Sequence, residues 1–183
     1  FLKSNRKERK SKGAKLILCV GTAMNSGKSH AAAACCYAIS SMGHAVRAAK
    51  ATGTASLKDI LLMEDCGAEK IADFSYLGHP STYMLSNEDL INIFDTIDQK
   101  FANNPEKYWV VEFSDGILQR ETAMLLSSKH IVDRLHKLVF CASDAFGVIG
   151  GLQVLKDKFD LVPDAISGVC SSSPLALREL SNY

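Results

Sequence analysis

The feature that most constrains the fold is the stretch of residues 14–21 (AKLILCVG), apolar throughout except for Lys15, which leads into a glycine-rich loop. A continuous run, rather than an alternating one, is typical of a strand buried on both faces of a parallel sheet. The loop spans residues 21–29 (GTAMNSGKS), and the alanine-rich stretch 29–42 (SHAAAACCYAISSM) favours a helix packed closely on that sheet. The sequence therefore predicts a strand, a loop and a helix in direct succession.

The residue types in this loop indicate that it binds phosphate. Backbone N–H groups of a glycine-rich loop can turn inward around an anion, and the positive N-terminus of the next helix points at the same place. The ammonium of Lys28 adds a charge next to the β- and γ-phosphates, and the hydroxyl of Ser29 can bind Mg²⁺. We therefore predict a nucleotide-binding P-loop. The residues expected to hold the nucleotide are Gly21, Thr22, Asn25, Ser26, Gly27, Lys28 and Ser29.

The spacing of the loop departs by one residue from the common form G-x-x-x-x-G-K-[ST]. That form would place its first glycine at position 22, where the chain has Thr22, and the glycine comes one residue earlier as Gly21. The alternative is a turn rich in glycine and serine that contains a lysine by chance. The buried strand before the loop and the helix after it favour the phosphate-binding interpretation.

Strands and helices alternate along the rest of the chain. Further strands are expected at residues 44–53, 70–74, 108–113, 137–143 and 165–169. Helices are expected at residues 57–66, 87–101 and 146–156, and a last helix after residue 173. Ser86 and Ser173 are expected as N-caps, with Pro174 as the first residue of the last helix. The alternation predicts an α/β fold, a three-layer sandwich with a mostly parallel central sheet.

Four motifs, in this order, resemble those of dethiobiotin synthetase and its P-loop relatives, including the cobyrinic acid amide synthases. The loop has the form G-T-x-x-x-x-G-K-[ST] of that family. Residues 50–53 (KATG) resemble K-P-x-x-[ST]-G, without the proline and with one residue fewer. Residues 110–112 (VVE), followed by Gly116, resemble V-E-G-x-G-G, and residues 146–149 (FGVI) resemble L-G-[ST]-I-N. The resemblance covers residues 14–169.

The resemblance implies an ATP- and magnesium-dependent enzyme of the ligase type, which transfers a phosphoryl group from ATP to activate a small acid. It implies that Lys50 contacts the γ-phosphate or an anionic substrate and that Glu112 binds Mg²⁺ together with Ser29. Lys28, Lys50 and Glu112 are then the expected catalytic residues. The resemblance also implies a small-molecule acid or amine as substrate, and a homodimer.

Acidic residues at strand ends are the candidate magnesium ligands from the residue pattern itself. Glu112 ends an apolar strand, and ligands of open α/β sheets bind at the carboxyl edge. A carboxylate at that edge can bind Mg²⁺. Asp115 is the substitute if Glu112 faces away. Asp144 could serve as well, although a residue in its position more often caps the following helix.

Two other functions fit a phosphate-binding loop. One is a nucleotide-dependent switch or assembly ATPase, although the extra lysine near the loop start of its deviant relatives is here replaced by Thr22 and Ala23. The other is a small-molecule kinase, which needs arginines that close over the phosphates, and Arg120, Arg134 and Arg178 form no cluster. No N-K-x-D motif for guanine recognition occurs, so ATP is the expected nucleotide.

Composition argues against several other classes of protein. The net charge of +1 gives no general argument for a nucleic-acid partner. No apolar run approaches the ~20 residues that a membrane-spanning helix needs. The six cysteines include no C-x-x-C pair and are expected to be reduced core thiols, which indicates a cytoplasmic protein.

The first thirteen residues differ from the rest of the chain. Residues 1–13 carry six positive charges and one negative charge, and we expect a flexible basic leader or a linker from a preceding domain. Residues 14–183 are expected to form the nucleotide-binding domain. Residues 65–85 have no counterpart in dethiobiotin synthetase. Their polar loop at 79–83 fits a functional loop and a surface turn equally well.

Overall fold

A six-stranded parallel sheet forms the centre of the computed structural model, which describes residues 13–182. The strands lie in the order β3-β2-β4-β1-β5-β6, and every neighbouring pair is parallel. Apart from Gly13, the expected basic leader lies outside the described residues. The strands are β1 (Lys15–Gly21), β2 (Val46–Lys50), β3 (Ile71–Asp73), β4 (Tyr108–Glu112), β5 (Leu135–Cys141) and β6 (Ala165–Ser167).

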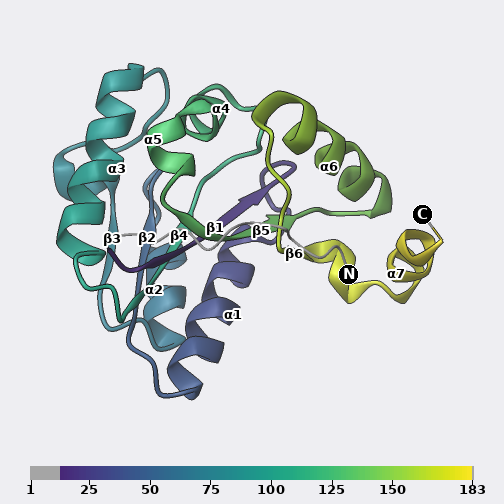
Figure 1. The fold of residues 1–183 in the computed structure, drawn as a ribbon, viewed down its shortest axis with the longest axis horizontal. Coiled ribbons are helices and arrows are strands. Elements are labelled where there is room, and N and C mark those ends of the chain that lie inside the picture. The colour runs from purple at the N-terminus through teal and green to yellow at the C-terminus, as the bar shows by residue number, and fades with distance from the viewer. Residues whose placement is uncertain (1–12, 183) are drawn as a thin grey trace.

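Helices cover both faces of this sheet (Figure 1). Helices α1 and α2 lie on one face, α3 to α6 lie on the other, and α7 lies to the side near β6. The predicted three-layer α/β sandwich is therefore confirmed, and the described sheet is parallel throughout. The helices are α1 (Lys28–Ser41), α2 (Leu57–Asp65), α3 (Asn87–Phe101), α4 (Arg120–Ser127), α5 (Lys129–Val132), α6 (Ala145–Phe159) and α7 (Pro174–Ser181), with 3₁₀ turns η1 (Phe74–Leu77) and η2 (Val169–Ser172).

Two apolar cores hold the layers together, one on each face of the sheet. The larger core includes Phe94, whose ring lies 5.3 Å from that of Trp109 and 6.1 Å from that of Phe113. The smaller core holds α1 against β1 through small side chains such as Ala32 and Cys36, both fully buried. Small residues at this contact allow the helix that follows the P-loop to lie close to the sheet, which fixes its direction relative to β1.

The helices α3, α6 and α7 begin directly after the capping residues that the sequence suggests. Ser86 and Asp89 form a reciprocal capping box at α3, and Ser173 accepts a hydrogen bond from the N–H of Ala176 at α7. Asp144 caps α6 by accepting from the N–H of Gly147 at 2.6 Å, which is the structural role that the sequence favours for it. Capping residues satisfy N–H groups that a helix start leaves without an intrahelical partner.

The sequence assigned no helix to residues 114–136, and the structure has two there, α4 and α5. Both are short, and Gln119, which is not one of the preferred N-cap residues, caps α4. The strand β5 begins at Leu135, two residues before the predicted start. The prediction missed these residues because the exposed His136 and Lys137 interrupt the apolar pattern of the strand.

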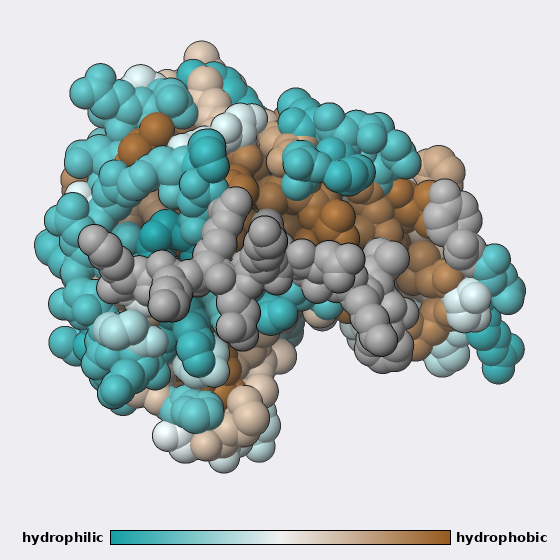
Figure 2. All heavy atoms as spheres, viewed as in Figure 1, coloured by the Kyte–Doolittle hydropathy of each residue, from teal (hydrophilic) through white to brown (hydrophobic). Residues whose placement is uncertain are grey.

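Apolar residues are distributed unevenly over the surface. Apolar residues gather between α6 and α7, whereas polar residues cover much of the surface over α3 (Figure 2). None of the helices in residues 13–182 combines the length and the apolarity that crossing a membrane requires. All six cysteines are free, and Cys19, Cys36, Cys141 and Cys170 are buried.

Candidate functional site

The predicted P-loop lies at the carboxyl edge of the sheet, in its middle. It leaves β1 at Gly21, between the neighbouring strands β4 and β5, and enters α1 at Lys28. Asn25 and Gly27 have positive φ values of 61° and 96°, so the chain turns back sharply before the helix. This turn directs the N-terminus of α1 toward the edge where ligands of parallel α/β sheets bind.

Backbone hydrogen bonds with the end of β5 and with the turn after β6 hold the P-loop in this shape. Its start is fixed at Thr22, whose N–H donates to the carbonyl of Cys141 at 2.9 Å. Its middle is fixed at Ser26, whose carbonyl accepts from the N–H of Val169 at 3.2 Å. Gly168, just after β6, lies so close that a Cβ there would stand 2.2 Å from the carbonyl oxygen of Ser26. No sequence motif marks Gly168 as part of the site.

We expect replacement of Gly168 by alanine to abolish nucleotide binding, although residue 168 is far from the loop in sequence. The residue has a φ of +97°, and an added Cβ would displace the carbonyl of Ser26 and the backbone of Ala142. The matched control is Gly150→Ala in α6, where a Cβ meets nothing within 4 Å. Titration with a fluorescent nucleotide checks this; equal binding by both variants would show that Gly168 does not shape the loop.

Lys28 is held inside the loop by the loop itself. Its side chain is 5% exposed, and Nζ donates to the carbonyl oxygen of Ala23 at 2.7 Å. Burial lowers the pKa of Lys28, while the carboxylates of Glu112 and Asp115 oppose that effect. A buried ammonium close to backbone N–H groups needs an anionic partner, and a chain of phosphates can bind to both.

Glu112 brings a carboxylate to the same place from β4. Its Oε1 accepts from the hydroxyl of Ser29 at 3.1 Å and from that of Ser114 at 3.0 Å. Its Oε2 is buried and has no hydrogen-bond partner among residues 13–182. Burial raises the pKa of Glu112 above its usual value, and Lys50, Ser114 and Lys28 offset only part of that increase. A buried acceptor without a hydrogen bond costs roughly 1–3 kcal/mol in lost hydration. A cation bound at Oε2 would compensate for that cost.

The donor set fits Mg²⁺ brought in with phosphates. Within residues 13–182, no three His, Cys, Asp or Glu side chains converge closely enough to hold a metal ion by themselves. Magnesium usually keeps waters and binds through one or two carboxylates plus substrate phosphates. The free oxygen of Glu112 and the adjacent hydroxyl of Ser29 match that mode, and Asp115 lines the same cavity.

A second buried lysine, Lys50, faces this cavity from the end of β2. Its Nζ lies 2.5 Å from Oδ2 of Asp59 and donates to the carbonyl oxygen of Thr54 at 2.9 Å. Lys28, Lys50 and Glu112 line one cavity of about 580 Å³ at the carboxyl edge. Two ammonium groups and a carboxylate therefore meet on the walls of one cavity that opens beside the P-loop.

The structure divides the predicted site residues into two groups. Asn25, Gly27, Lys28, Ser29, Lys50 and Glu112 line the cavity. Gly21, Thr22 and Ser26 lie behind it and build the loop: Ser26 is fully buried, and a Cβ on Gly21 would stand 2.2 Å from its Oγ. His30 is exposed and also lines the cavity.

The arginines that a small-molecule kinase would need are engaged elsewhere. Arg120 donates to the carbonyl of Leu85 and to Glu121, and Arg134 donates to Asp98. Arg178 lies in α7, at the side of the sheet. None of the three lines the cavity beside the P-loop, so the described residues supply no arginine lid.

Comparison with known proteins supports the fold and not a particular family. No protein-family model matches the sequence, and a search of curated proteins finds no match. A crystal structure of the signal recognition particle receptor FtsY from Elizabethkingia anophelis, in complex with GDP, is similar with a TM-score of 0.53 and 11% identity. The match covers 90% of this chain and 50% of that chain, so this chain spans about half the length of the receptor structure.

A second structure of the same receptor has a TM-score of 0.48 and 12% identity over 83% of this chain and 49% of that chain. At such identities the similarity concerns the fold alone. The parallel sheet, the loop after β1 and the first match together identify a P-loop NTPase fold. The resemblance to dethiobiotin synthetase receives no support from these comparisons.

Proposed function

We propose that this chain is a magnesium-dependent nucleoside triphosphatase that acts as a nucleotide-dependent switch. The observation that carries the proposal is that Lys28, Ser29 and Glu112 line one cavity, where Oε2 of Glu112 is buried with no hydrogen-bond partner in the described part of the chain. These are the parts that P-loop NTPases use to hold the β- and γ-phosphates and the metal.

Each residue has a role that follows from its position. Lys28 exchanges its hydrogen bond to Ala23 for phosphate oxygens, and the N-terminus of α1 adds its positive end. Ser29 and Glu112 hold Mg²⁺, which neutralises charge on the phosphates when it is bound. Lys50 stands across the cavity and stabilises charge on the terminal phosphate during its transfer to water.

The switch part of the proposal rests on the contacts of Lys50. In the structure, the carboxylate of Asp59 in α2 and the carbonyl of Thr54 accept hydrogen bonds from its ammonium. We expect a terminal phosphate, and not a diphosphate, to compete with Asp59 for Lys50. The triphosphate and diphosphate states then differ in how firmly the turn at 51–56 and the start of α2 are held, and a partner could read that difference.

Hydrogen exchange and phosphate release test this proposal together. We expect slow release of phosphate in Mg²⁺ that Lys28→Ala abolishes and Gly150→Ala preserves. We also expect peptides from residues 51–65 to exchange at different rates in the triphosphate-analogue and diphosphate states. Identical exchange in the two states would rule out the switch and leave a simple nucleotidase.

Activation of a small acid is the second candidate, and one observation favours it. Beyond the P-loop, the cavity is also lined by Thr54, Ser56 and Lys58, beside the buried Lys50, so its far wall offers hydroxyls and cations to an anionic acceptor. Phosphate release stimulated by a panel of carboxylic acids and amines, and not by a protein partner, would favour this candidate over the switch.

The base of the nucleotide needs a direct test because two arguments diverge. The absence of an N-K-x-D motif favours ATP, whereas the similar receptor structure holds GDP. All binding experiments proposed for this chain therefore use the adenine and guanine nucleotides in parallel. A preference for one base identifies the substrate, and the phosphate contacts predicted above are the same for both.

A further inference from the structure

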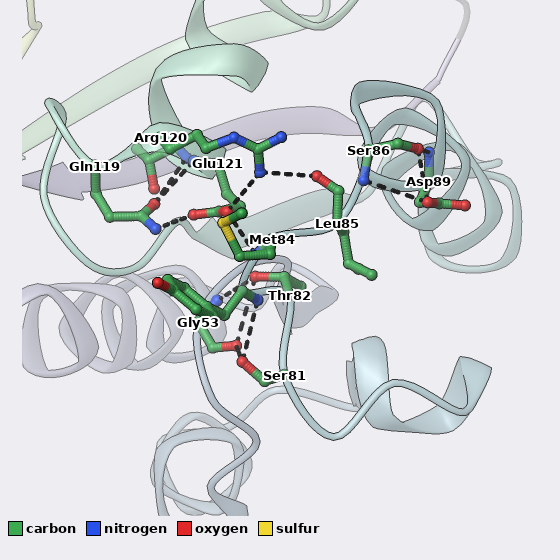
Figure 3. Close-up of polar contacts among 12 residues, drawn as sticks. Gly53, Ser81, Thr82, Met84, Leu85, Ser86, Asp89, Gln119, Arg120 and Glu121 are labelled. Atoms are coloured by element: carbon green, nitrogen blue, oxygen red, sulfur yellow. Dashed lines mark hydrogen bonds and ion pairs between the residues drawn. The ribbon is translucent and has the colours of Figure 1, made fainter.

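A buried carboxylate outside the cavity, Glu121, ties together two loops of the site. Glu121 lies in the first turn of α4, and its side chain is 1% exposed. Its Oε1 accepts from the backbone N–H of Met84 at 2.8 Å and from Nη1 of Arg120 at 2.9 Å, and Nε2 of Gln119 donates to Oε2 (Figure 3). Burial raises the pKa of Glu121, but the hydrogen bonds from Met84 and Arg120 outweigh it and leave the pKa below its usual value.

Residues 81–85, which we call the bridge segment, connect α4 with the turn after β2 (Figure 3). At one end, the carbonyl of Leu85 accepts from Nη1 of Arg120 at 2.9 Å. At the other end, the N–H of Thr82 donates to the carbonyl of Gly53 at 2.9 Å, and the N–H of Gly53 donates to Oγ1 of Thr82 at 2.9 Å. The bridge segment is thus fixed to α4 on one side and to Gly53 on the other.

Gly53 in turn touches two side chains that face the phosphate site. It has a φ of +111°, and a Cβ on it would stand 3.3 Å from Cε of Lys50 and 2.9 Å from Cβ of Ser114. Ser114 is the residue whose hydroxyl donates to Glu112. Gly53 therefore lies against Lys50 and Ser114, with no room for a side chain between them.

Met84, which donates its N–H to Glu121, has an unusual backbone conformation. Its φ is 63°, in the left-handed region that residues other than glycine rarely adopt. Its side chain is 64% exposed, so packing of that side chain does not account for the conformation. Two hydrogen bonds hold it instead: the N–H of Leu85 closes a turn onto the carbonyl of Thr82 at 3.2 Å, and the N–H of Met84 donates to the buried carboxylate of Glu121.

We propose that Glu121 is a positioning residue for the terminal phosphate of the nucleotide. By holding Met84 in its left-handed conformation, it fixes the bridge segment, and through Gly53 it fixes Lys50. This inference rests on the proposed nucleotide binding. The P-loop is held by other contacts, at Thr22 and Ser26, so Glu121 affects the terminal phosphate and leaves the rest of the nucleotide untouched.

The test compares the affinity for a nucleoside diphosphate with that for its non-hydrolysable triphosphate in Mg²⁺, by calorimetry. In Glu121→Ala, we expect the triphosphate to bind about tenfold more weakly and the diphosphate to bind within about twofold of wild type. Glu121→Gln keeps an oxygen that can accept from Met84 and should show a smaller loss. The double variant Glu121→Ala/Met84→Gly should recover much of the triphosphate affinity, because glycine adopts a positive φ without help.

The outcomes separate this inference from its alternatives. Equal weakening of both ligands by Glu121→Ala, with no recovery in the double variant, would mean that Glu121 only supports the fold and would overturn the inference. An unchanged ratio of the two affinities would overturn it too. If the wild-type chain binds neither ligand, the proposed function itself fails and this inference fails with it. Thermal unfolding of each variant shows whether a loss reflects folding, and in that case Glu121→Gln decides.

Discussion

Replacement of Lys28 by alanine is expected to weaken the binding of a magnesium–nucleoside triphosphate about 10- to 100-fold. Lys28 is 5% exposed, and its ammonium already donates to a loop carbonyl, so it is positioned before the ligand arrives. A hydrogen bond to a charged group contributes roughly 1.5–3 kcal/mol, and about 1.4 kcal/mol corresponds to a tenfold change in affinity. Displacement of a fluorescent nucleotide analogue measures the effect.

The matched control for this substitution is Lys129→Ala. Lys129 lies on α5, where its side chain is 82% exposed and paired with Asp133. This variant loses the same charge from the protein surface, and it should bind nucleotide as the wild type does. A comparable loss in both variants would mean that general electrostatic attraction, rather than a built phosphate site, holds the ligand.

Substitution of Glu112 by glutamine is expected to lower magnesium-dependent phosphate release about 100-fold, with a much smaller effect on nucleotide binding. Glutamine keeps the length of the side chain and an oxygen that can accept from Ser29 and Ser114. It lacks the negative charge that Mg²⁺ needs at the position of Oε2. Phosphate release measured over a series of magnesium concentrations checks the prediction.

Two further variants make this result interpretable. Glu106→Gln removes a carboxylate from an exposed loop and should leave turnover unchanged. Asp115→Asn tests the other carboxylate that lines the cavity. If Glu112→Gln turns over normally and Asp115→Asn does not, the metal role belongs to Asp115. Asp144 caps α6, which is the role that its position in the sequence favours.

Local signals in the sequence were enough to predict much of the fold. The apolar run of β1, the alanine-rich α1 and the capping residue Ser86 each depend on neighbours within a few positions. The alternation of strands and helices then predicted a parallel sheet in three layers. The order β3-β2-β4-β1-β5-β6 was beyond such reasoning, because it depends on pairing between residues far apart in the chain. The helix α4 was missed because it is short and has an unusual cap.

The residues of the candidate site also fall into those that local sequence predicts and those that depend on distant parts of the chain. Lys28 and Ser29 follow from one contiguous motif, and Lys50 and Glu112 follow from their places at strand ends; all four line the cavity. The contacts that support them could not be predicted. Gly168 lies against the P-loop in the turn after β6, and Asp59 of α2 forms an ion pair with Lys50. The bridge segment belongs to residues 65–85, which matched no motif. Such contacts arise only when the sheet brings distant loops to one edge.

Calorimetric titration of the wild-type chain with non-hydrolysable ATP and GTP analogues, in Mg²⁺ and in a chelator, tests the central claim most directly. The P-loop geometry predicts saturable binding at one site for at least one analogue. It also predicts that removal of Mg²⁺ weakens this binding, because Glu112 then loses its cation. Absence of saturable heat with both analogues at millimolar concentrations would contradict the claim that residues 21–29 form a phosphate site.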